Sequence, residues 1–168
     1  MRIRANQPLA PVIRELARGD EATVEAVFAG LTPEQRWQRF HAAMPRLPLT
    51  VRRTLADVDG HDRVALVVEL GERAIGIGRY TRIGAAVAEI ALAVVAEHTG
   101  RGIGKALLEA LVRRALQAGI EELVFEVIGT NSVALHLARS RGARLERTPW
   151  VVHGSLTLGV VPHTSPAA

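Results

Sequence analysis

Residues 87–111 read V-A-E-I-A-L-A-V-V-A-E-H-T-G-R-G-I-G-K-A-L-L-E-A-L, and this stretch decides the fold of the chain. Residues 87–95 are apolar except for Glu89, and so long an apolar run is typical of a strand that is covered on both faces. A glycine-rich turn follows, and after it apolar residues recur at helical spacing. The stretch therefore predicts a buried strand, a short turn and an amphipathic helix that begins near Arg101.

The turn has the features of an anion site. Gly100, Gly102 and Gly104 let the backbone approach a ligand or adopt a positive φ. A helix start leaves its first N–H groups unpaired and carries partial positive charge. Because Arg101 and Lys105 add full positive charges there, we expect this turn to bind a phosphate of a cofactor.

Two common phosphate loops do not fit these residues. A P-loop, G-x-x-x-x-G-K-[ST], would need glycine at Thr99 and serine or threonine at Ala106. The dinucleotide fingerprint G-x-G-x-x-G would need glycine at Lys105 or, in the other register, at Leu107. A plain strand-to-helix turn remains open as the alternative.

The stretch resembles the acyl-CoA signature of the GNAT acetyltransferase superfamily, [QR]-x-x-G-x-[GA] after a hydrophobic strand. Gly102 and Gly104 match its end, while Thr99 stands where glutamine or arginine is usual. A later segment is similar to the superfamily's N-x-x-A-x-x-L…G pattern, with Asn131, Ala134, Leu137 and Gly142 in those places. The chain is also similar to bacterial Pat-type protein lysine acetyltransferases, and this likeness spans residues 12–158. The matching segments occur in the order seen in that group: Ile13-Arg14, Asp20, Leu31-Thr32, Arg39-Phe40, Asp57-Val58-Asp59, residues 76–80 and residues 88–91.

The resemblance implies an α/β (α+β mixed sheet) GNAT fold. Its sheet is largely antiparallel, with a central parallel strand pair splayed around acyl-CoA and helices on both faces. Acetyl-CoA is then the co-substrate. The backbone N–H groups near Val94 and Val95 are expected to polarise its thioester, if the strand bulges there. The residues expected to bind it are Val94, Val95, Thr99, Gly100, Arg101, Gly102, Ile103, Gly104, Lys105 and Asn131.

Two of these assignments have structural alternatives. The loop residues could form an ordinary helix cap with solvated basic side chains, and Asn131 could equally be a helix N-cap without another role.

Acetyl transfer to an amine requires a general base. An ammonium with a pKa near 10.4 is only about 0.1% neutral at pH 7.4, which corresponds to roughly 4 kcal/mol of deprotonation. Glu89 is the only ionisable residue in the predicted central strand, and an apolar setting raises a carboxyl pKa toward that of a useful base. In the resembling family a glutamate in this context has that role. The alternative is an ion pair between Glu89 and Arg79 or Arg82 of a neighbouring strand.

The general acid is not identified. Many GNAT enzymes use a tyrosine seven residues beyond the motif asparagine, and that position is Ala138 here. Tyr80, the only tyrosine, is interpreted as a core or cleft residue, and a thiol leaving group with a pKa of about 8–9 can depart without an acid. The histidines show no metal-ligand spacing, so we expect no metal; His98 is expected on a surface loop.

Composition narrows the class further. The chain has 168 residues, 48% of them hydrophobic, which is enough to form one hydrophobic core. We expect an extended leader at residues 1–11, a single GNAT domain at 12–160 and a disordered tail at 161–168. Zero cysteines exclude a cysteinyl intermediate. With a net charge of only +4 and 4% aromatic residues, we expect no nucleic-acid partner. No apolar run suits a membrane span or signal peptide, so we expect a cytoplasmic protein, monomeric or homodimeric.

The remaining periodicities and turn signals predict the other elements. We expect strands at residues 12–16, 63–70, 74–82, 123–128, 143–147 and 152–158. We expect helices at 22–30, from Thr32 onward, at 50–58, from Arg101 to Gly119 and from Asn131 to Gly142.

The resemblance implies an N-acetyltransferase that acts by direct transfer in a ternary complex, with a protein lysine as the preferred acceptor. A small-molecule amine (polyamine, amino acid or aminoglycoside) and a non-catalytic acyl-CoA-binding regulator remain alternatives. The sequence does not choose between acetyl and a longer acyl group.

Overall fold

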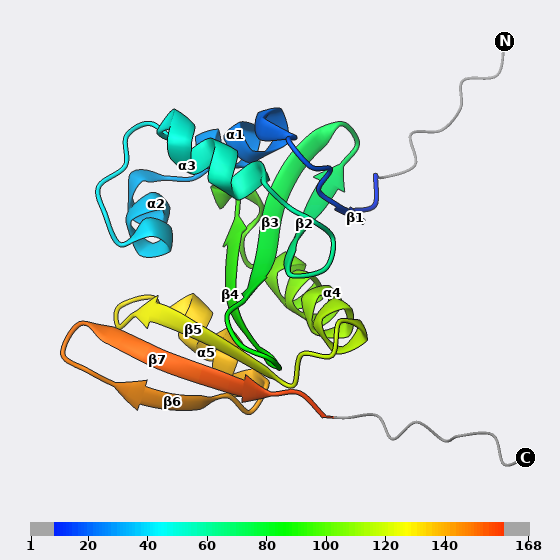
Figure 1. Ribbon diagram of the computed structural model, residues 1–168. Helices are drawn as coiled ribbons and strands as arrows, with labels where there is room; N and C mark the ends of the chain where they lie inside the picture. The colour runs from blue at the N-terminus through cyan, green and yellow to red at the C-terminus, as the bar shows by residue number, and fades with distance from the viewer. Residues whose placement is uncertain (1–8, 160–168) are drawn as a thin grey trace, which may run out of the picture.

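The computed structural model describes residues 9–159, which form one seven-stranded sheet with helices on both faces (Figure 1). The strand order is β1-β2-β3-β4-β5-β7-β6. Residues 1–8 of the expected leader and all of the expected tail lie outside the described residues. The strands are β1 (Val12–Glu15), β2 (Arg63–Leu70), β3 (Arg73–Arg82), β4 (Val87–Val94), β5 (Glu122–Ile128), β6 (Arg144–Arg147) and β7 (Val151–Thr157). The helices are α1 (Glu21–Ala29), α2 (Pro33–Phe40), α3 (Leu49–Ala56), the short 3-10 helix η1 (Ala96–His98), α4 (Ile103–Gln117) and α5 (Ser132–Ser140).

All neighbouring strands are antiparallel except β4 and β5, which form the predicted central parallel pair. Their pairing covers only Val87↔Glu122, Ala88↔Leu123 and Glu89↔Val124. Beyond Glu89, β4 continues for five residues beside β3 but without a partner in β5. The sheet therefore opens at this point, and the predicted splay is confirmed.

Two hydrophobic clusters hold the helices to the sheet. The larger cluster lies between α4 and the sheet and includes Leu107 and Leu111 of α4, Ala88 and Ile90 of β4, and Tyr80 of β3. The smaller cluster joins α1 and α3 to the opposite face of β2 and β3. Since side chains alternate along a strand, Ala88 and Ile90 face α4 while Glu89, Ala91 and Ala93 face the layer of α1, α2 and α3.

The prediction that the central strand is covered on both faces is only partly correct. On the α4 side Ala88 and Ile90 are buried, but on the other side Glu89 is exposed and Ala91 and Ala93 are half-buried. The three short N-terminal helices do not cover the whole of that face. The uncovered part lies at the point where β4 and β5 separate.

The local signals in the sequence account for most element boundaries. Asp20 caps α1, accepting a hydrogen bond from the Thr23 N–H at 3.1 Å. Thr32 and Gln35 form a capping box at α2, and Gly119 follows α4 with a φ of 72°. All predicted strands and helices are present, with ends shifted by one or two residues; η1 was not predicted.

Two single-residue expectations were tested by burial. Tyr80 is fully buried and its hydroxyl donates to the His61 carbonyl at 3.0 Å, so it is a core residue. His98 was expected on a surface loop, and this is wrong: it lies in η1 and is buried.

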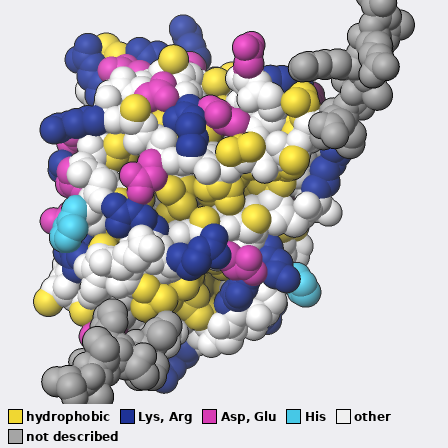
Figure 2. All heavy atoms as spheres, turned by 90° about the vertical axis from the view of Figure 1, so that its right-hand side faces the viewer, with side chains coloured by type: hydrophobic (Ala, Val, Ile, Leu, Met, Phe, Trp, Pro, Cys, Tyr) yellow, Lys and Arg dark blue, Asp and Glu magenta, His cyan; other side chains and the backbone are white. Residues whose placement is uncertain are grey.

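Charges of both signs are interspersed on the face that carries the β1–β2 edge and α4 (Figure 2). Ion pairs there join Arg14 to Glu69 at 2.6 Å and Arg114 to Glu15 at 2.7 Å. That face therefore carries no separate basic patch. Among residues 9–159, no helix is long and apolar enough to cross a membrane, and no group of three or more His, Asp or Glu side chains is arranged to hold a metal.

Candidate active site

The start of α4 presents a row of unpaired backbone N–H groups. No N–H from Gly100 to Lys105 donates a hydrogen bond to another described residue, whereas Thr99 N–H bonds the Ala96 carbonyl and Ala106 N–H bonds that of Gly102. Gly100 and Gly102 have φ values of 72° and 79°, which other residues rarely adopt. Six consecutive amides are thus free for an anion at a helix N-terminus.

No side chain caps this helix. Its N-cap residue is Gly102, no acidic residue lies in its first turn, and Arg101 and Lys105 are exposed. Neither basic side chain forms an ion pair within residues 9–159. The alternative of a conventional side-chain cap is therefore not realised. The loop instead has the geometry and charge of a phosphate site.

The free edge of β4 leads from the splay point toward this loop. The Val95 N–H donates to the Ile75 carbonyl at 2.9 Å, so the peptide groups of Val94 and Leu92 point away from β3 by alternation. The Val94 carbonyl accepts a hydrogen bond from Gln35 Nε2 of α2 at 3.0 Å. The Val94 N–H has no partner among the described residues and faces the opening between β4 and β5.

The prediction that Val95 donates its amide to the thioester is wrong. Its N–H is bound within the sheet, and its side chain is buried against Gly30, where an added Cβ would lie 2.7 Å from Val95 Cγ1. The expected bulge is also absent, since β3 and β4 stay in register from Ala88 to Val94. The opening arises because β5 diverges, and the amide that faces it is that of Val94.

Glu89 lies at the last paired position of β4, on the face away from α4. Its carboxylate has no hydrogen bond or ion pair with residues 9–159. The two arginines that could have neutralised it are engaged elsewhere: Arg82 binds Asp62 at 2.6 Å and Arg79 binds the Leu55 carbonyl at 2.8 Å. The alternative of a structural ion pair is therefore not observed. Glu89 is an exposed, unpaired carboxylate at the splay point.

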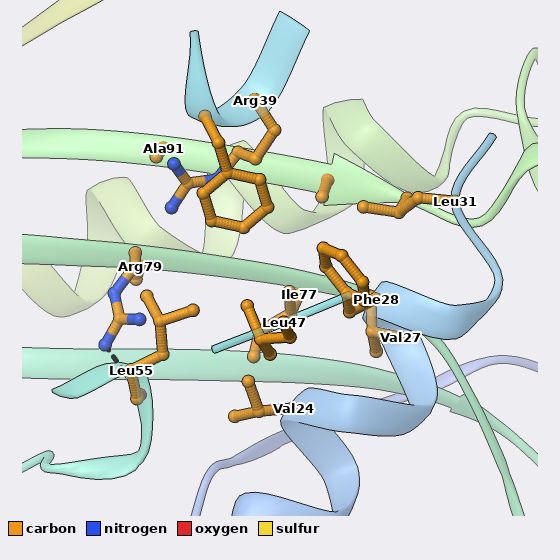
Figure 3. A pocket seen from close by; sticks show the side chains of 12 residues that line it. Val24, Val27, Phe28, Leu31, Arg39, Leu47, Leu55, Ile77, Arg79 and Ala91 are labelled. Carbon is orange, nitrogen blue, oxygen red and sulfur yellow. Dashed lines mark hydrogen bonds between the residues drawn. The ribbon is translucent and has the colours of Figure 1, made fainter. Parts of the chain in front are cut away.

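A small cavity of about 30 Å³ lies on the same face of the sheet. It is lined by apolar residues from α1, α3, β3 and β4 together with Arg39 of α2 and Arg79 of β3 (Figure 3). Burial of the Arg39 guanidinium lowers its pKa, and the charge of Glu89 partly offsets this effect. Burial, and next the positive charge of Arg39, lower the pKa of Arg79 to about 10.

The other expected site residues have local structural roles. Asn131 caps α5, accepting a hydrogen bond from the Ala134 N–H at 3.1 Å. Thr99 is exposed and its hydroxyl donates to the Ala96 carbonyl at 2.9 Å. Ala138 is buried in α5. The position of a GNAT tyrosine thus holds no acid here.

Gln35, Arg39 and Arg79 were not predicted as site residues. Gln35 and Arg39 share one helix face at i,i+4 spacing, and Arg79 lies opposite Ala91 on the face of the sheet that carries Glu89. The sequence held one weak indication that Arg79 is a site residue, namely a charged residue between two apolar residues of a strand. Nothing in the sequence indicates that Gln35 and Arg39 reach the site, because this depends on how α2 packs against β4.

Comparison with known proteins places this geometry in a family. Residues 25–143 match the sequence model of the Acetyltransferase (GNAT) family. The chain belongs to this family. A search of curated proteins finds no match.

Solved GNAT structures share the fold. The GNAT domain of S. lividans PAT is 27% identical, with a TM-score of 0.82, over 93% of this chain and 100% of that domain. The ribosomal-protein-S18-alanine N-acetyltransferase from Escherichia coli is 16% identical, with a TM-score of 0.68, over 94% and 100% of the two chains. The yncA protein of Salmonella typhimurium, solved with its cofactor acetyl-CoA, is 18% identical, with a TM-score of 0.59, over 95% and 99%. The chain is therefore an acyl-CoA-dependent N-acetyltransferase with acetyl-CoA as co-substrate.

Proposed function

We propose that this acetyltransferase transfers the acetyl group of acetyl-CoA to the side chain of a protein lysine by direct attack, with Glu89 as general base. The observation that carries the proposal is the free carboxylate of Glu89 at the splay point. The free amides of residues 100–105 lie at the start of α4, where Gly104 is close to Val94: an added Cβ on Gly104 would lie 3.9 Å from Val94 Cγ2. We assign residues 12–160 to this one catalytic domain.

The cofactor side of the site is built from backbone groups. The amides of residues 100–105 and the charges of Arg101 and Lys105 bind the diphosphate. The pantetheine arm then lies along the free edge of β4, where it can pair as an added strand would. Gln35 already occupies the Val94 carbonyl, so the Val94 N–H is the group left to bind the thioester oxygen.

The acceptor side supplies the base. Glu89 takes a proton from the lysine ammonium, directly or through water, and the neutral nitrogen attacks the thioester carbonyl carbon. The Val94 N–H stabilises the negative oxygen that forms. The carbon–sulfur bond then breaks, the nitrogen releases its extra proton to solvent to give the neutral amide, and the thiolate takes a proton from solvent. With a thiol pKa of about 8.5 by analogy with cysteine, this departure needs no residue in the tyrosine position.

Two observations support a protein lysine as the acceptor. The ordered motifs from Ile13 to Ala91 resemble Pat-type lysine acetyltransferases, and the S. lividans PAT domain is 27% identical over nearly the whole chain. Glu89 is also exposed and open to a bulky partner, as a side chain on a protein surface requires.

Replacing Glu89 by glutamine tests the role of the base. Glu89→Gln should lower kcat by about 10²–10⁴-fold, because the amide cannot accept the proton. The dissociation constant for acetyl-CoA should stay within about twofold, because Glu89 does not belong to the phosphate loop. Glu72→Gln, in the exposed turn between β2 and β3, is the matched control and should retain full activity. Undiminished turnover in Glu89→Gln would refute the role of Glu89.

The acceptor class is tested separately. Lysate incubated with isotopically labelled acetyl-CoA and the enzyme should carry the label on lysine residues of one or a few proteins, as mass spectrometry would reveal. Label found only on small amines would contradict a protein acceptor and leave the base assignment intact.

A further inference from the structure

The cavity on the Glu89 face of the sheet is basic, although the proposed reaction has a cationic substrate. Of its described lining residues, Arg39 and Arg79 are charged and the other ten are apolar. Figure 3 shows both guanidinium groups on the same side of the cavity, Arg39 extending from α2 and Arg79 extending from β3 toward Leu55. Two like charges therefore lie near the position where a lysine ammonium must arrive.

Among residues 9–159, the guanidinium of Arg39 contacts an aromatic ring but no hydrogen-bond acceptor. Within residues 9–159 its guanidinium forms no hydrogen bond and no ion pair, and it lies 5.0 Å from the centre of the Phe40 ring. Arg36, on the same helix, shows what a structural arginine does here: it donates to the carbonyls of Phe28, Pro45 and Ala29. The five N–H donors of Arg39 are thus left for another group.

Arg79 is only partly satisfied. It donates one hydrogen bond, from Nη2 to the Leu55 carbonyl at 2.8 Å, and this bond holds the guanidinium at the cavity wall. The pKa of Arg79 is lowered by burial and by Arg39, and that of Arg39 is lowered by burial. Burial thus makes both cations less stable than they would be in water, and at Arg79 the charge of Arg39 adds to this effect; an anion placed between the two guanidinium groups would offset it.

Glu89 supplies only part of that negative charge: burial lowers the pKa of Arg39 more than Glu89 raises it, and Glu89 is not among the causes of the lowered pKa of Arg79. It forms no ion pair with either arginine, and its carboxylate must stay free to accept a proton. The cavity of about 30 Å³ suits a small planar group, and a guanidinium binds carboxylates through paired, parallel hydrogen bonds.

We propose that Arg39 and Arg79 bind a carboxylate of the acceptor, so that the enzyme selects lysines with an aspartate or glutamate side chain beside the reactive amine. This inference rests on the proposed function, because it assumes that the amine reacts next to Glu89. The carboxylate offsets the repulsion between the arginines and the incoming ammonium. Arg39 is then a specificity residue, while Glu89 remains the base.

Paired peptides test this selectivity. Two lysine peptides that differ only in having glutamate or glutamine next to the lysine are compared by kcat/KM, together with free lysine against lysinamide. We expect the carboxylate-bearing partner of each pair to be preferred by about tenfold to hundredfold, the range of a hydrogen bond to a charged group. Arg39→Gln should bring the ratio close to one. Arg39→Lys, which keeps the charge but not the paired donors, should retain part of it.

Controls separate this effect from misfolding and from the proposed function. Arg144→Gln, at an exposed position on β6, should keep the wild-type ratio, and all variants should bind acetyl-CoA within about twofold of wild type. Binding of the same peptides with norleucine in place of lysine, measured by fluorescence anisotropy with CoA present, gives a readout independent of turnover. Equal use of both members of each pair by the wild type, or an unchanged ratio in Arg39→Gln, would overturn the inference. If only free lysine reacts, the protein acceptor is wrong, and the ratio to lysinamide still decides the role of the arginines.

Discussion

At the scale of single residues, the loop of residues 100–105, which we propose binds the cofactor, depends on backbone conformation more than on side chains. Gly102 has a φ of 79°, and an added Cβ there would meet nothing within 4 Å. Glycine is therefore needed for its dihedral angle and not for space. The open surface above it is what leaves the neighbouring amides accessible.

Gly102→Ala tests this reading. The positive φ should cost about 1 kcal/mol of stability, and the realigned amides should weaken acetyl-CoA binding by about tenfold or more. Gly19→Ala is a matched control, because Gly19 has a φ of 80° and equally free surroundings but lies in the turn before α1. Chemical denaturation should show similar losses for both variants, and calorimetry should show weaker binding only for Gly102→Ala. If Gly102→Ala bound acetyl-CoA as tightly as Gly19→Ala does, the loop amides would not be the groups that bind the diphosphate.

A second residue-scale prediction concerns sheet packing. A Cβ on Gly154 of β7 would lie 2.1 Å from Phe125 Cε2 of β5, so the aromatic ring occupies the space of the missing side chain. Gly154→Ala should lower the unfolding free energy by about 1–3 kcal/mol, because the ring must shift. Thermal unfolding would measure the change, and Phe125→Leu should restore part of the loss in the double variant. A neutral Gly154→Ala would show that the ring moves freely.

At the scale of elements, α2 links the two halves of the site. Its capping box fixes Gln35, whose Oε1 accepts from the Thr32 N–H at 3.0 Å while its Nε2 donates to the Val94 carbonyl. One turn later the same helix face carries Arg39 into the cavity that we propose binds part of the acceptor. The helix start predicted from Thr32-Pro33-Glu34-Gln35 therefore also orients the edge of β4.

Replacing each member of the capping box separates its two roles. Thr32→Ala and Gln35→Ala should each destabilise the protein by about 1 kcal/mol through the lost cap. Only Gln35→Ala also frees the Val94 carbonyl, so it alone should raise the KM for acetyl-CoA, by about threefold to tenfold. Steady-state kinetics at saturating acceptor would show this difference. The same KM in both variants would mean that the bond to Val94 does not affect the cofactor site.

The elements were more predictable than the contacts between them. Strand periodicity, the cap at Asp20 and the glycine at 119 are local, so the sequence predicted the helices and strands nearly to their ends. The loop at 100–105 and Glu89 lie in one continuous stretch and were predicted for the same reason. The position of Arg39 and Arg79 in one cavity, the bound amide of Val95 and the exposure of Glu89 depend on register and helix packing across the fold, which no local pattern encodes.

At the scale of the whole molecule, the opening in the sheet connects the two proposed substrate sites. Strands β1–β4 and β5–β7 are joined at three residue pairs and then diverge, as Figure 1 shows. The cofactor loop follows β4 at one end of this opening, and the arginine-lined cavity lies on the α1–α3 face. The two substrates can thus bind at the same time from different sides, as direct transfer requires.

The stability of the whole fold should fall in acid partly through Asp59. Hydrogen bonds from the Arg63, His61 and Asp62 N–H groups lower the pKa of Asp59 to about 2. Because the folded pKa lies below the unfolded value of 3.8, the stabilisation is present above pH 4 and is lost as the pH falls toward 2. The melting temperature of Asp59→Asn should therefore depend less on pH than that of wild type between pH 4 and 2. If the melting temperatures of the two proteins fell equally between pH 4 and 2, Asp59 would not contribute to the loss of stability in acid.

The central claim is that the amides of residues 100–105 hold the CoA diphosphate and so place the thioester beside Glu89. A crystal structure of the complex with acetyl-CoA tests it most directly. We expect the diphosphate oxygens within hydrogen-bond distance of these amides, the thioester oxygen at the Val94 N–H, and the Glu89 carboxylate facing the acetyl carbon from the acceptor side. A cofactor bound away from the start of α4, or a thioester that lies on the face of the sheet opposite Glu89, would contradict the account.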